Sequence, residues 1–171
     1  LDRVDVVGGD ALGPAVDCGV VGEEEAGPKA DDPGAEVVAD LRHRQRGAGL
    51  QYRRAGEVNP EDYQSPSLEA FTLRTMKRTE EARAAYARSL QAIERHVEFN
   101  PDDSRAIFLG ATALIDLGQK ERAFEWIRRA EAIDPGDPYL LYGVACFYSR
   151  MDDADTAVGY FEKALAAGFA H

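Results

Sequence analysis

The 171-residue chain has few of the residues that build catalytic or metal sites, with only two cysteines and three histidines. Cys18 and Cys146 are too few for a disulfide framework, and neither has a neighbour at metal-ligand spacing. The three histidines stand in unrelated contexts, and none has a second one four residues away. We therefore expect no catalytic residue, no metal site and no cofactor, so the composition argues against an enzyme.

The chain also lacks a long apolar run and a long basic run. No segment approaches the roughly 20 apolar residues of a membrane-spanning helix, and the N-terminus lacks the regions of a signal peptide. Acidic residues outnumber basic ones by 31 to 20, and the net charge of −11 repels a nucleic acid backbone. We expect a soluble, cytoplasmic protein that binds neither a membrane nor a nucleic acid.

Residues 1–50 contain no Phe, Tyr, Trp, Ile, Met, Ser, Thr or Asn. Their short apolar runs show no sustained period of 2 or 3.6 residues. Without aromatic side chains, this segment can bury little apolar area against the entropy of ordering. We predict that residues 1–46 form a low-complexity, poorly ordered segment.

Translation out of frame is another explanation for this composition. Every residue from 1 to 50 except Cys18 and Lys29 can be encoded by a codon that begins with G or C. A GC-rich gene read in the wrong frame has this property, because its G/C-biased third positions become first positions. The other explanation is a genuine Ala/Gly/Pro-rich linker, and the coding DNA would distinguish the two.

From residue 47 onward the chain is helical in pattern and contains aromatic residues. In its most regular stretch, 104–135, bulky apolar residues recur at helical spacing, and small residues stand where two helices would approach closely. Gly118 ends the first helical pattern, and Asp134-Pro135 ends the second, since proline cannot continue a helix. The stretch therefore predicts two antiparallel helices joined by a tight turn.

The same pattern repeats along the chain. Pro101, Pro135 and Phe169 are evenly spaced, and Pro60 marks the same turn at the end of an earlier, shorter stretch. The even interval is about 34 residues, which is in the range of stacked units that are each too small to bury an apolar face alone. We predict an all-α fold of stacked antiparallel helix pairs that follows a poorly ordered N-terminal segment.

A period of this kind resembles the tetratricopeptide repeat (TPR) family, whose units have small or large residues at fixed positions. The unit that begins at Ser104 has Ala111, Leu114, Ala123, Ile127, Ala130 and Pro135 there. The unit that begins at Pro138 has Ala145, Tyr148, Ala157, Phe161 and Ala164, with Phe169 in place of the proline. The unit that begins at Tyr63 has Ala70, Leu73, Ala82, Tyr86 and Ser89. The resemblance implies a TPR-type right-handed superhelix.

This resemblance divides residues 47–171 into a half unit, 47–60, and three units, 63–101, 104–135 and 138–169. The unit 63–101 runs about two helical turns longer than the family pattern, and it has Lys77 where the interhelical turn usually has glycine. The half unit matches a second helix through Ala48, Tyr52, Ala55 and Pro60.

In this family the first helices of the units line a concave groove that receives an extended peptide or a partner's helix. The groove-facing positions correspond here to Arg105, Phe108, Thr112, Ile115 and Asp116, and to Tyr139, Tyr142, Cys146, Ser149 and Arg150. Exposed aromatics beside arginine are enriched in binding hot spots. The resemblance therefore implies a protein–protein interaction scaffold, with burial against the neighbouring unit as the alternative role of each residue.

Two further expectations come from family subtypes. TPR domains that grip the C-terminal carboxylate of a chaperone use Lys and Asn where this chain has Phe108, Thr112 and Gly143, which argues against a chaperone clamp. The ending FEKALAAGFAH resembles the C-terminal repeats of large bacterial signalling proteins, in which TPRs follow a cyclase or kinase domain. An alternative function is therefore that of a C-terminal regulatory fragment of a larger bacterial enzyme.

A third alternative is self-association. A capping helix normally follows the last unit of such a repeat, and this chain stops at His171. An uncapped unit would expose apolar surface on Phe161, Leu165 and Phe169. This surface predicts a homo-oligomer formed through the C-terminal unit.

Overall fold

The structure, a computed structural model, describes residues 33–59 and 61–169, with residues 33–42 described by their backbone only. Every element in these ranges is an α-helix. The helices are α1 (Pro33–Val58), α2 (Gln64–Thr75), α3 (Thr79–Phe99), α4 (Ser104–Asp116), α5 (Lys120–Ile133), α6 (Pro138–Ser149) and α7 (Ala154–Ala166). This confirms the predicted all-α fold of stacked helix pairs.

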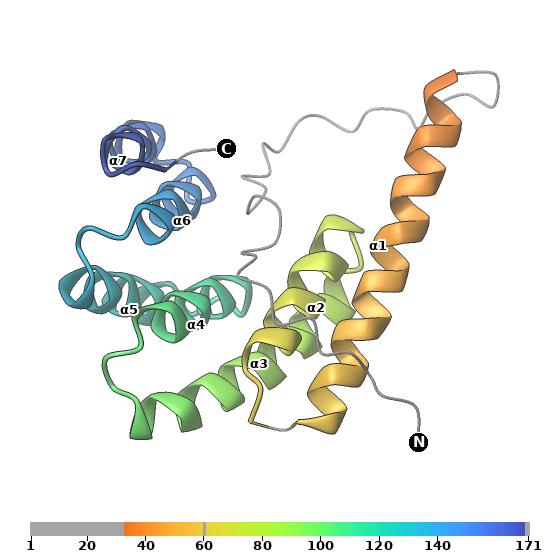
Figure 1. The fold of residues 1–171 in the computed structure, drawn as a ribbon, viewed down its shortest axis with the longest axis horizontal. Helices are drawn as coiled ribbons and strands as arrows, with labels where there is room; N and C mark the ends of the chain where they lie inside the picture. The colour runs from red at the N-terminus through yellow and green to blue at the C-terminus, as the bar shows by residue number, and fades with distance from the viewer. Residues whose placement is uncertain (1–32, 60, 170–171) are drawn as a thin grey trace.

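The pairs α2–α3, α4–α5 and α6–α7 follow one another around an arc (Figure 1). The first helices, α2, α4 and α6, lie along the inner side of the arc and contact one another in that order. The second helices, α3, α5 and α7, lie along the outer side. We call the side formed by α2, α4 and α6 the inner face.

The three pairs have the same kind of turn between their helices. Lys77, Gly118 and Asp152 adopt left-handed backbone conformations, with φ of 58°, 81° and 60°. In each turn, the next residue's N–H donates to the carbonyl five residues earlier, at 2.8 to 3.1 Å. This hydrogen bond is typical of a helix C-terminus that glycine favours. Lysine and aspartate carry a Cβ, so their turns have a steric cost that Gly118 avoids.

Aspartates begin three of the helices. The carboxylates of Asp103, Asp137 and Asp153 each accept a hydrogen bond from the N–H three residues later, at the start of α4, α6 and α7. These bonds satisfy backbone donors that the first helical turn leaves free. The aspartates therefore fix where α4, α6 and α7 begin.

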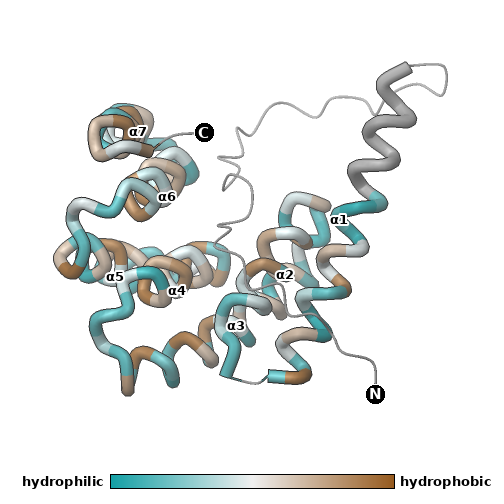
Figure 2. Tube along the Cα trace, in the orientation of Figure 1, coloured by the Kyte–Doolittle hydropathy of each residue, from teal (hydrophilic) through white to brown (hydrophobic). Residues whose placement is uncertain are grey.

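Buried apolar residues form the core between the helices, and hydrophobic and hydrophilic stretches alternate along the coloured parts of the helices in Figure 2. The side chains of Ile93, Ile107, Leu114 and Ile127 are fully buried in one core. At Gly110, an added Cβ would overlap the ring of Trp126 on α5. Small residues therefore let the helices approach closely, as the sequence predicted.

The unit 63–101 is lengthened in its second helix, as predicted. α3 has 21 residues, whereas α5 has 14 and α7 has 13. Its extra turns bring His96 to Asp103, with 2.7 Å between Nε2 and Oδ2. The Tyr63 hydroxyl donates to the same Oδ2 at 3.1 Å.

Asp103 is thereby the centre of a small polar cluster. Burial raises the pKa of its carboxyl, but hydrogen bonds from the Ala106 N–H, His96 and Tyr63 outweigh burial, so the pKa lies below its usual value. Burial also raises the pKa of the Tyr63 phenol. The cluster joins the start of α2, the end of α3 and the start of α4.

The helix α1 begins before the predicted boundary at residue 47. It starts at Pro33, whose fixed φ suits the first helical turn, and it continues through Ala, Glu, Leu, Arg and Gln, which are good helix formers. The low-complexity segment 1–46 was predicted to be poorly ordered. Residues 1–32 of that segment lie outside the described residues, whereas 33–46 are helical.

The helix α1 packs against α2 through two of its glycines. A Cβ at Gly49 or Gly56 would lie 3.6 Å from side-chain atoms of Thr72 or Pro66, so these glycines face α2. Ala55, one of the residues that match the repeat pattern, is exposed. The segment lacks a clear apolar stripe, so its sequence pattern could not define the buried face.

Candidate functional site

The inner face brings together residues from three units, because equivalent positions recur on α2, α4 and α6. All ten predicted groove positions belong to α4, to α6 or to the residue after α6. Arg105, Tyr139 and Ser149 are exposed, and the others except Cys146 are partly exposed. Cys146 is 1% exposed and therefore offers almost no surface to a partner.

Phe108 packs against the next unit. A Cβ on Gly143 of α6 would lie 2.5 Å from Cζ of the Phe108 ring, so the ring occupies the space that glycine leaves. The Thr112 hydroxyl donates to the Phe108 carbonyl at 3.2 Å, within α4. Phe108 therefore has a packing role between units, and its side chain is only partly exposed.

Asp116 and Arg150 were both predicted to face a ligand, and in the structure they bind each other. The distance from Arg150 Nη2 to Asp116 Oδ2 is 2.6 Å, and the two side chains are 14% and 16% exposed. The pair connects the end of α4 to the residue that follows α6. Because the two positions are exactly one repeat period apart, the period itself places the two charges side by side.

Two residues of the first unit adjoin this pair, and sequence reasoning did not select them for the site. Tyr86 of α3 is 2% exposed, and burial together with the Asp116 charge raises its pKa to about 12, although Arg74 and Arg150 oppose the rise. The guanidinium carbon of Arg74 lies 5.1 Å from the centre of the Phe71 ring. Arg74, Tyr86, Asp116 and Arg150 thus form one polar cluster, which we call the arginine cluster.

Arg74 and Tyr86, the two members from the first unit, each have a buried polar atom. Among the residues that the structure describes, Arg74 Nε and the Tyr86 hydroxyl are buried without a hydrogen bond of good geometry, and the two side chains lie close enough to interact with each other. The sequence contained a signal for Arg74 and Phe71. When the first unit is aligned with the second, these residues correspond to Ile115 and Thr112, which are predicted groove positions. The family pattern was applied to the first helices of the two later units, 104–135 and 138–169, so the predicted groove positions do not include α2.

Aromatic side chains cover part of α6 at the other end of the inner face. Phe169 stacks on Tyr142 with ring centres 4.4 Å apart, and it meets the Tyr139 ring edge-on at 5.5 Å. Phe161 of α7 lies 6.1 Å from Tyr142. Tyr139 nevertheless remains 51% exposed. Phe169, which stands where the repeat pattern has proline, thus packs back onto α6, the first helix of the last unit.

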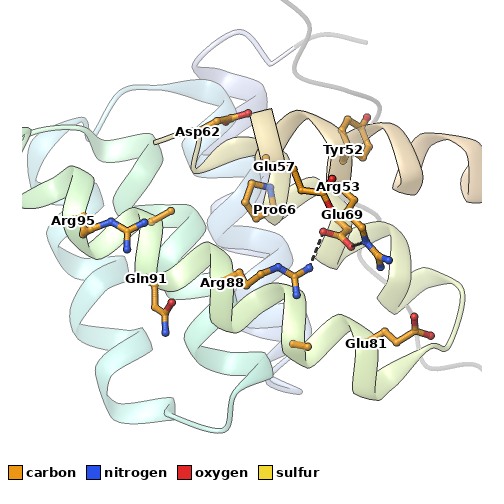
Figure 3. Close-up of a pocket in the computed structure, with 13 residues that line it drawn as sticks. Tyr52, Arg53, Glu57, Asp62, Pro66, Glu69, Glu81, Arg88, Gln91 and Arg95 are labelled. Atoms are coloured by element: carbon orange, nitrogen blue, oxygen red, sulfur yellow. Dashed lines mark hydrogen bonds and ion pairs between the residues drawn. The ribbon is translucent and has the colours of Figure 1, made fainter. Parts of the chain in front are cut away.

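A separate cavity of about 580 Å³ lies between α1, α2 and α3 (Figure 3). Glu69 at its wall is buried, with Oε1 2.7 Å from Arg53 Nε and Oε2 2.9 Å from Arg88 Nη2. Sequence reasoning did not identify this cavity. Both carboxylate oxygens of Glu69 have partners, so the arrangement is that of a structural clamp between three helices.

Metal and membrane sites can be assessed only for the residues that the structure describes. Among them, no group of three or more His, Cys, Asp or Glu side chains could hold a metal ion. Within the same ranges, no helix is long and apolar enough to cross a membrane.

Residues 104–137 match the family model described as Tetratricopeptide repeat. This segment contains α4 and α5, so the match supports the predicted resemblance at the central unit. No curated protein matches the chain.

The chain is also similar to solved structures. They include the MamA RS-1 ArsTM double mutant, at 20% identity over 78% of this chain and 71% of that one, with a TM-score of 0.44. A second is MamA 41-end from Desulfovibrio magneticus RS-1, at 17% identity, 80% and 96% coverage and a TM-score of 0.43. A third is YrrB, described as a TPR protein with an unusual peptide-binding site, at 16% identity, 78% and 82% coverage and a TM-score of 0.39. Similarity at this level does not extend to function.

Proposed function

We propose that this chain, whose central unit matches the tetratricopeptide repeat, is a protein–protein interaction scaffold and not an enzyme. Its ligand would be an extended peptide or a helix of a partner protein, held along the inner face. The observation that carries the proposal is the set of aromatic side chains left open on successive first helices. Tyr139 is about half exposed, and Phe71, Phe108 and Tyr142 are partly exposed.

The physical reason is that stable monomers bury most large aromatic groups, whereas binding surfaces keep Tyr, Phe and Arg available. In this proposal Arg105, Thr112, Tyr139 and Tyr142 contact the ligand directly. Phe108, which packs against Gly143, contributes the part of its side chain that remains exposed. Asp116 and Arg150 shape one end of the inner face through their ion pair. Cys146 supports the face from below.

A mapping experiment tests this proposal. Random dodecapeptides are displayed and selected on the full chain, and one selected peptide is titrated into the ¹⁵N-labelled protein. We expect amide shifts on α2, α4 and α6, including Thr112, Tyr139 and Ser149. Shifts confined to α3, α5 and α7, or to the cavity beside α1, would overturn the proposal.

A matched pair of variants sharpens the test. Tyr139→Ser removes an exposed aromatic from the inner face, whereas Phe99→Ser removes one that is 84% exposed at the end of α3. We expect Tyr139→Ser to weaken the peptide about tenfold, which corresponds to about 1.4 kcal/mol, and Phe99→Ser to leave its affinity unchanged.

Self-association is a second candidate function, and one observation favours it. Val158, Phe161 and Leu165 recur along one side of α7 and are 57%, 38% and 47% exposed. Such a stripe matches the packing surface of a partner helix. Sedimentation equilibrium of the full chain would show a dimer that Val158→Asp with Leu165→Asp converts to a monomer. A native chain that is monomeric at tens of micromolar would eliminate this candidate.

The other alternative is a regulatory C-terminal fragment of a larger bacterial enzyme of the cyclase or serine/threonine kinase type. It keeps the same ligand-binding role for the inner face and adds a catalytic domain upstream. In-frame coding sequence that encodes such a domain before residue 50 would support it.

A further inference from the structure

The apolar residues exposed along one side of α7 are Val158, Phe161 and Leu165, and we call them the α7 stripe. Their side chains are 57%, 38% and 47% exposed. Among the helices that the structure describes, α7 contacts only α6, so no other described helix covers the stripe. An apolar row along one side of a helix indicates that another element packs there.

The earlier units show which kind of element covers this face. The positions equivalent to Phe161 are Ile127 of α5 and Tyr86 of α3, which are 0% and 2% exposed. Phe124, one repeat period before the first stripe residue, meets Phe147 of α6 edge-on with ring centres 5.4 Å apart. The second helix of an earlier unit thus packs against the first helix of the unit that follows, as α3 also does with α4. We infer from this equivalence that the α7 stripe receives a helix.

The border of the α7 stripe is acidic. Asp155 and Glu162 are exposed, and they stand three residues before and four residues after Val158, which places them one helical turn from it. Lys163 points elsewhere, because its Nζ lies 4.3 Å from the centre of the Tyr160 ring. A helix that combines exposed apolar residues with positive charge would therefore complement this face.

The helix α1 has a face of this kind. Leu50, Arg54 and Val58 are spaced four residues apart and lie on one side of α1. Leu50 is 51% exposed, Val58 is 86% exposed, and Arg54 is exposed as well. The helix α2 packs on a different side of α1, where Gly49 and Gly56 lie.

The charge and the position of α1 also fit. Five arginines and three acids give α1 a net charge of +2, the most positive among the described helices, in a chain whose net charge is −11. α1 and α7 lie at opposite ends of the stack (Figure 1), and they do not contact each other. The two complementary surfaces can therefore meet only between different copies of the chain, where opposite charge favours their encounter.

We propose that the α7 stripe receives α1 of a second copy of this chain, with Leu50 and Val58 against the stripe and Arg54 beside its acidic border. This inference rests on self-association, the second candidate function, and names the surface that α7 meets. Because the two surfaces differ, the contact is head-to-tail, and each dimer keeps one open surface of each kind. The dimer can therefore add further copies, unlike a symmetric dimer formed by two α7 stripes.

A mixing experiment tests this arrangement. One variant, Val158→Asp with Leu165→Asp, loses the α7 surface, and the other, Leu50→Asp with Val58→Asp, loses the α1 surface. Sedimentation equilibrium at tens of micromolar should show association of the native chain and a monomer for each variant alone. The equimolar mixture should form a 1:1 complex, because each variant retains the surface that the other lacks.

The control is Phe99→Asp, which places the same charge at an 84%-exposed residue of α3 and should associate like the native chain. The changed residues are all exposed, so circular dichroism and thermal melts should match those of the native chain. If a double variant loses helicity, Val58→Asp or Val158→Asp alone, at the more exposed position of each pair, replaces it.

The charge argument has a separate readout. Arg54→Glu should raise the Kd of association at least tenfold, because it brings a carboxylate to the acidic border of the α7 stripe. Arg83→Glu makes the same change at an exposed arginine of α3 and should alter this Kd less than twofold. Equal effects of the two changes would overturn the choice of α1.

The failures of the two proposals differ in outcome. If the variant without the α1 surface still associated, or if the mixture stayed monomeric, α1 would not be the partner, and this inference would be overturned while self-association of the native chain remained. A native chain that is monomeric would overturn both. Neither result affects peptide binding at the inner face, because that proposal depends on α2, α4 and α6.

Discussion

At the scale of single residues, two glycines set the distance between neighbouring helices. Gly110 makes room for Trp126 within its own unit, and Gly143 makes room for Phe108 between units. Any side chain at these positions must displace an aromatic ring that is already packed. A misfit there is strongly destabilising because protein interiors are close-packed.

We predict that Gly110→Ala lowers the free energy of unfolding by about 2 kcal/mol, since its methyl group would overlap the Trp126 ring. Gly159→Ala is the control, because Gly159 lies inside α7 with no described atom of a neighbour within 4 Å of an added Cβ. That change should stabilise the protein by about 0.5–1 kcal/mol through helix propensity. Urea unfolding measures both, and equal effects would contradict the packing argument.

The left-handed turn residues support a second prediction. Lys77→Gly and Asp152→Gly should each raise the free energy of unfolding by up to about 1 kcal/mol, because glycine adopts a φ near 60° without a Cβ clash. Gly118→Ala should lower it by about 1 kcal/mol for the same reason. If the two glycine variants were less stable than the native chain in thermal melts, the lysine and aspartate side chains would have to contribute contacts of their own.

At the scale of elements, polar residues hold helices whose apolar contacts are few. The buried carboxylate of Glu69 joins α2 to Arg53 of α1 and Arg88 of α3. Asp103 plays a comparable part where α3 meets α4. In both places one carboxylate accepts hydrogen bonds from several donors, and these bonds offset the free-energy cost of burying it.

The clamp at Glu69 predicts an asymmetric response to mutation. Arg53→Met with Arg88→Met should cost about 3 kcal/mol, because it leaves the 3%-exposed Glu69 side chain without partners. Glu69→Met should cost less than about 1 kcal/mol, since the arginines are 45% and 52% exposed and can turn to water. Chemical unfolding compares the two, and a larger loss for Glu69→Met would contradict this account.

Asp103 predicts how stability depends on pH. Its folded-state pKa is lowered, so its charge stabilises the fold above the unfolded value of about 3.9, and this contribution is lost as pH falls through the lower folded value. Asn at this position retains the helix cap but not the charge. The stability difference between the native chain and Asp103→Asn should therefore shrink as the pH falls from about 5 towards 3. A difference that persists unchanged in acid would contradict the prediction.

At the scale of the whole molecule, the chain is a stack in which each pair depends on its neighbours. α4 contacts α2, α3, α5 and α6, so the central unit has partners on both sides. The stability of such a stack is close to the sum of unit and interface terms. The inner face exists only while consecutive units remain stacked.

This dependence predicts the behaviour of a shortened chain. Residues 102–171 contain two units and lose the α3–α4 interface, so they fall below the roughly three units that a repeat stack needs. We expect this fragment to melt less cooperatively and at a lower temperature than the full chain when followed by circular dichroism. A fragment that melts like the full chain would show that the two C-terminal units fold independently.

The helix pairs and their turns were predictable because their signals are local. Small residues, bulky residues, Gly118 and the prolines recur at a fixed period, and each acts within one unit or at its border. The start of α1 was not predictable, because residues 1–46 lack the apolar period that defines a buried face. The exposure of each groove residue was not predictable either, since that depends on side chains from the next unit.

The repeat period by itself determined which residues share the inner face, because helical geometry carries equivalent positions to equivalent places. Only the tertiary structure decided what each residue meets there. Asp116 pairs with Arg150 of the following unit. Arg74, in the last turn of α2, instead stacks beside Phe71 and interacts with Tyr86. That choice depends on distances between units, which no local pattern in the sequence encodes.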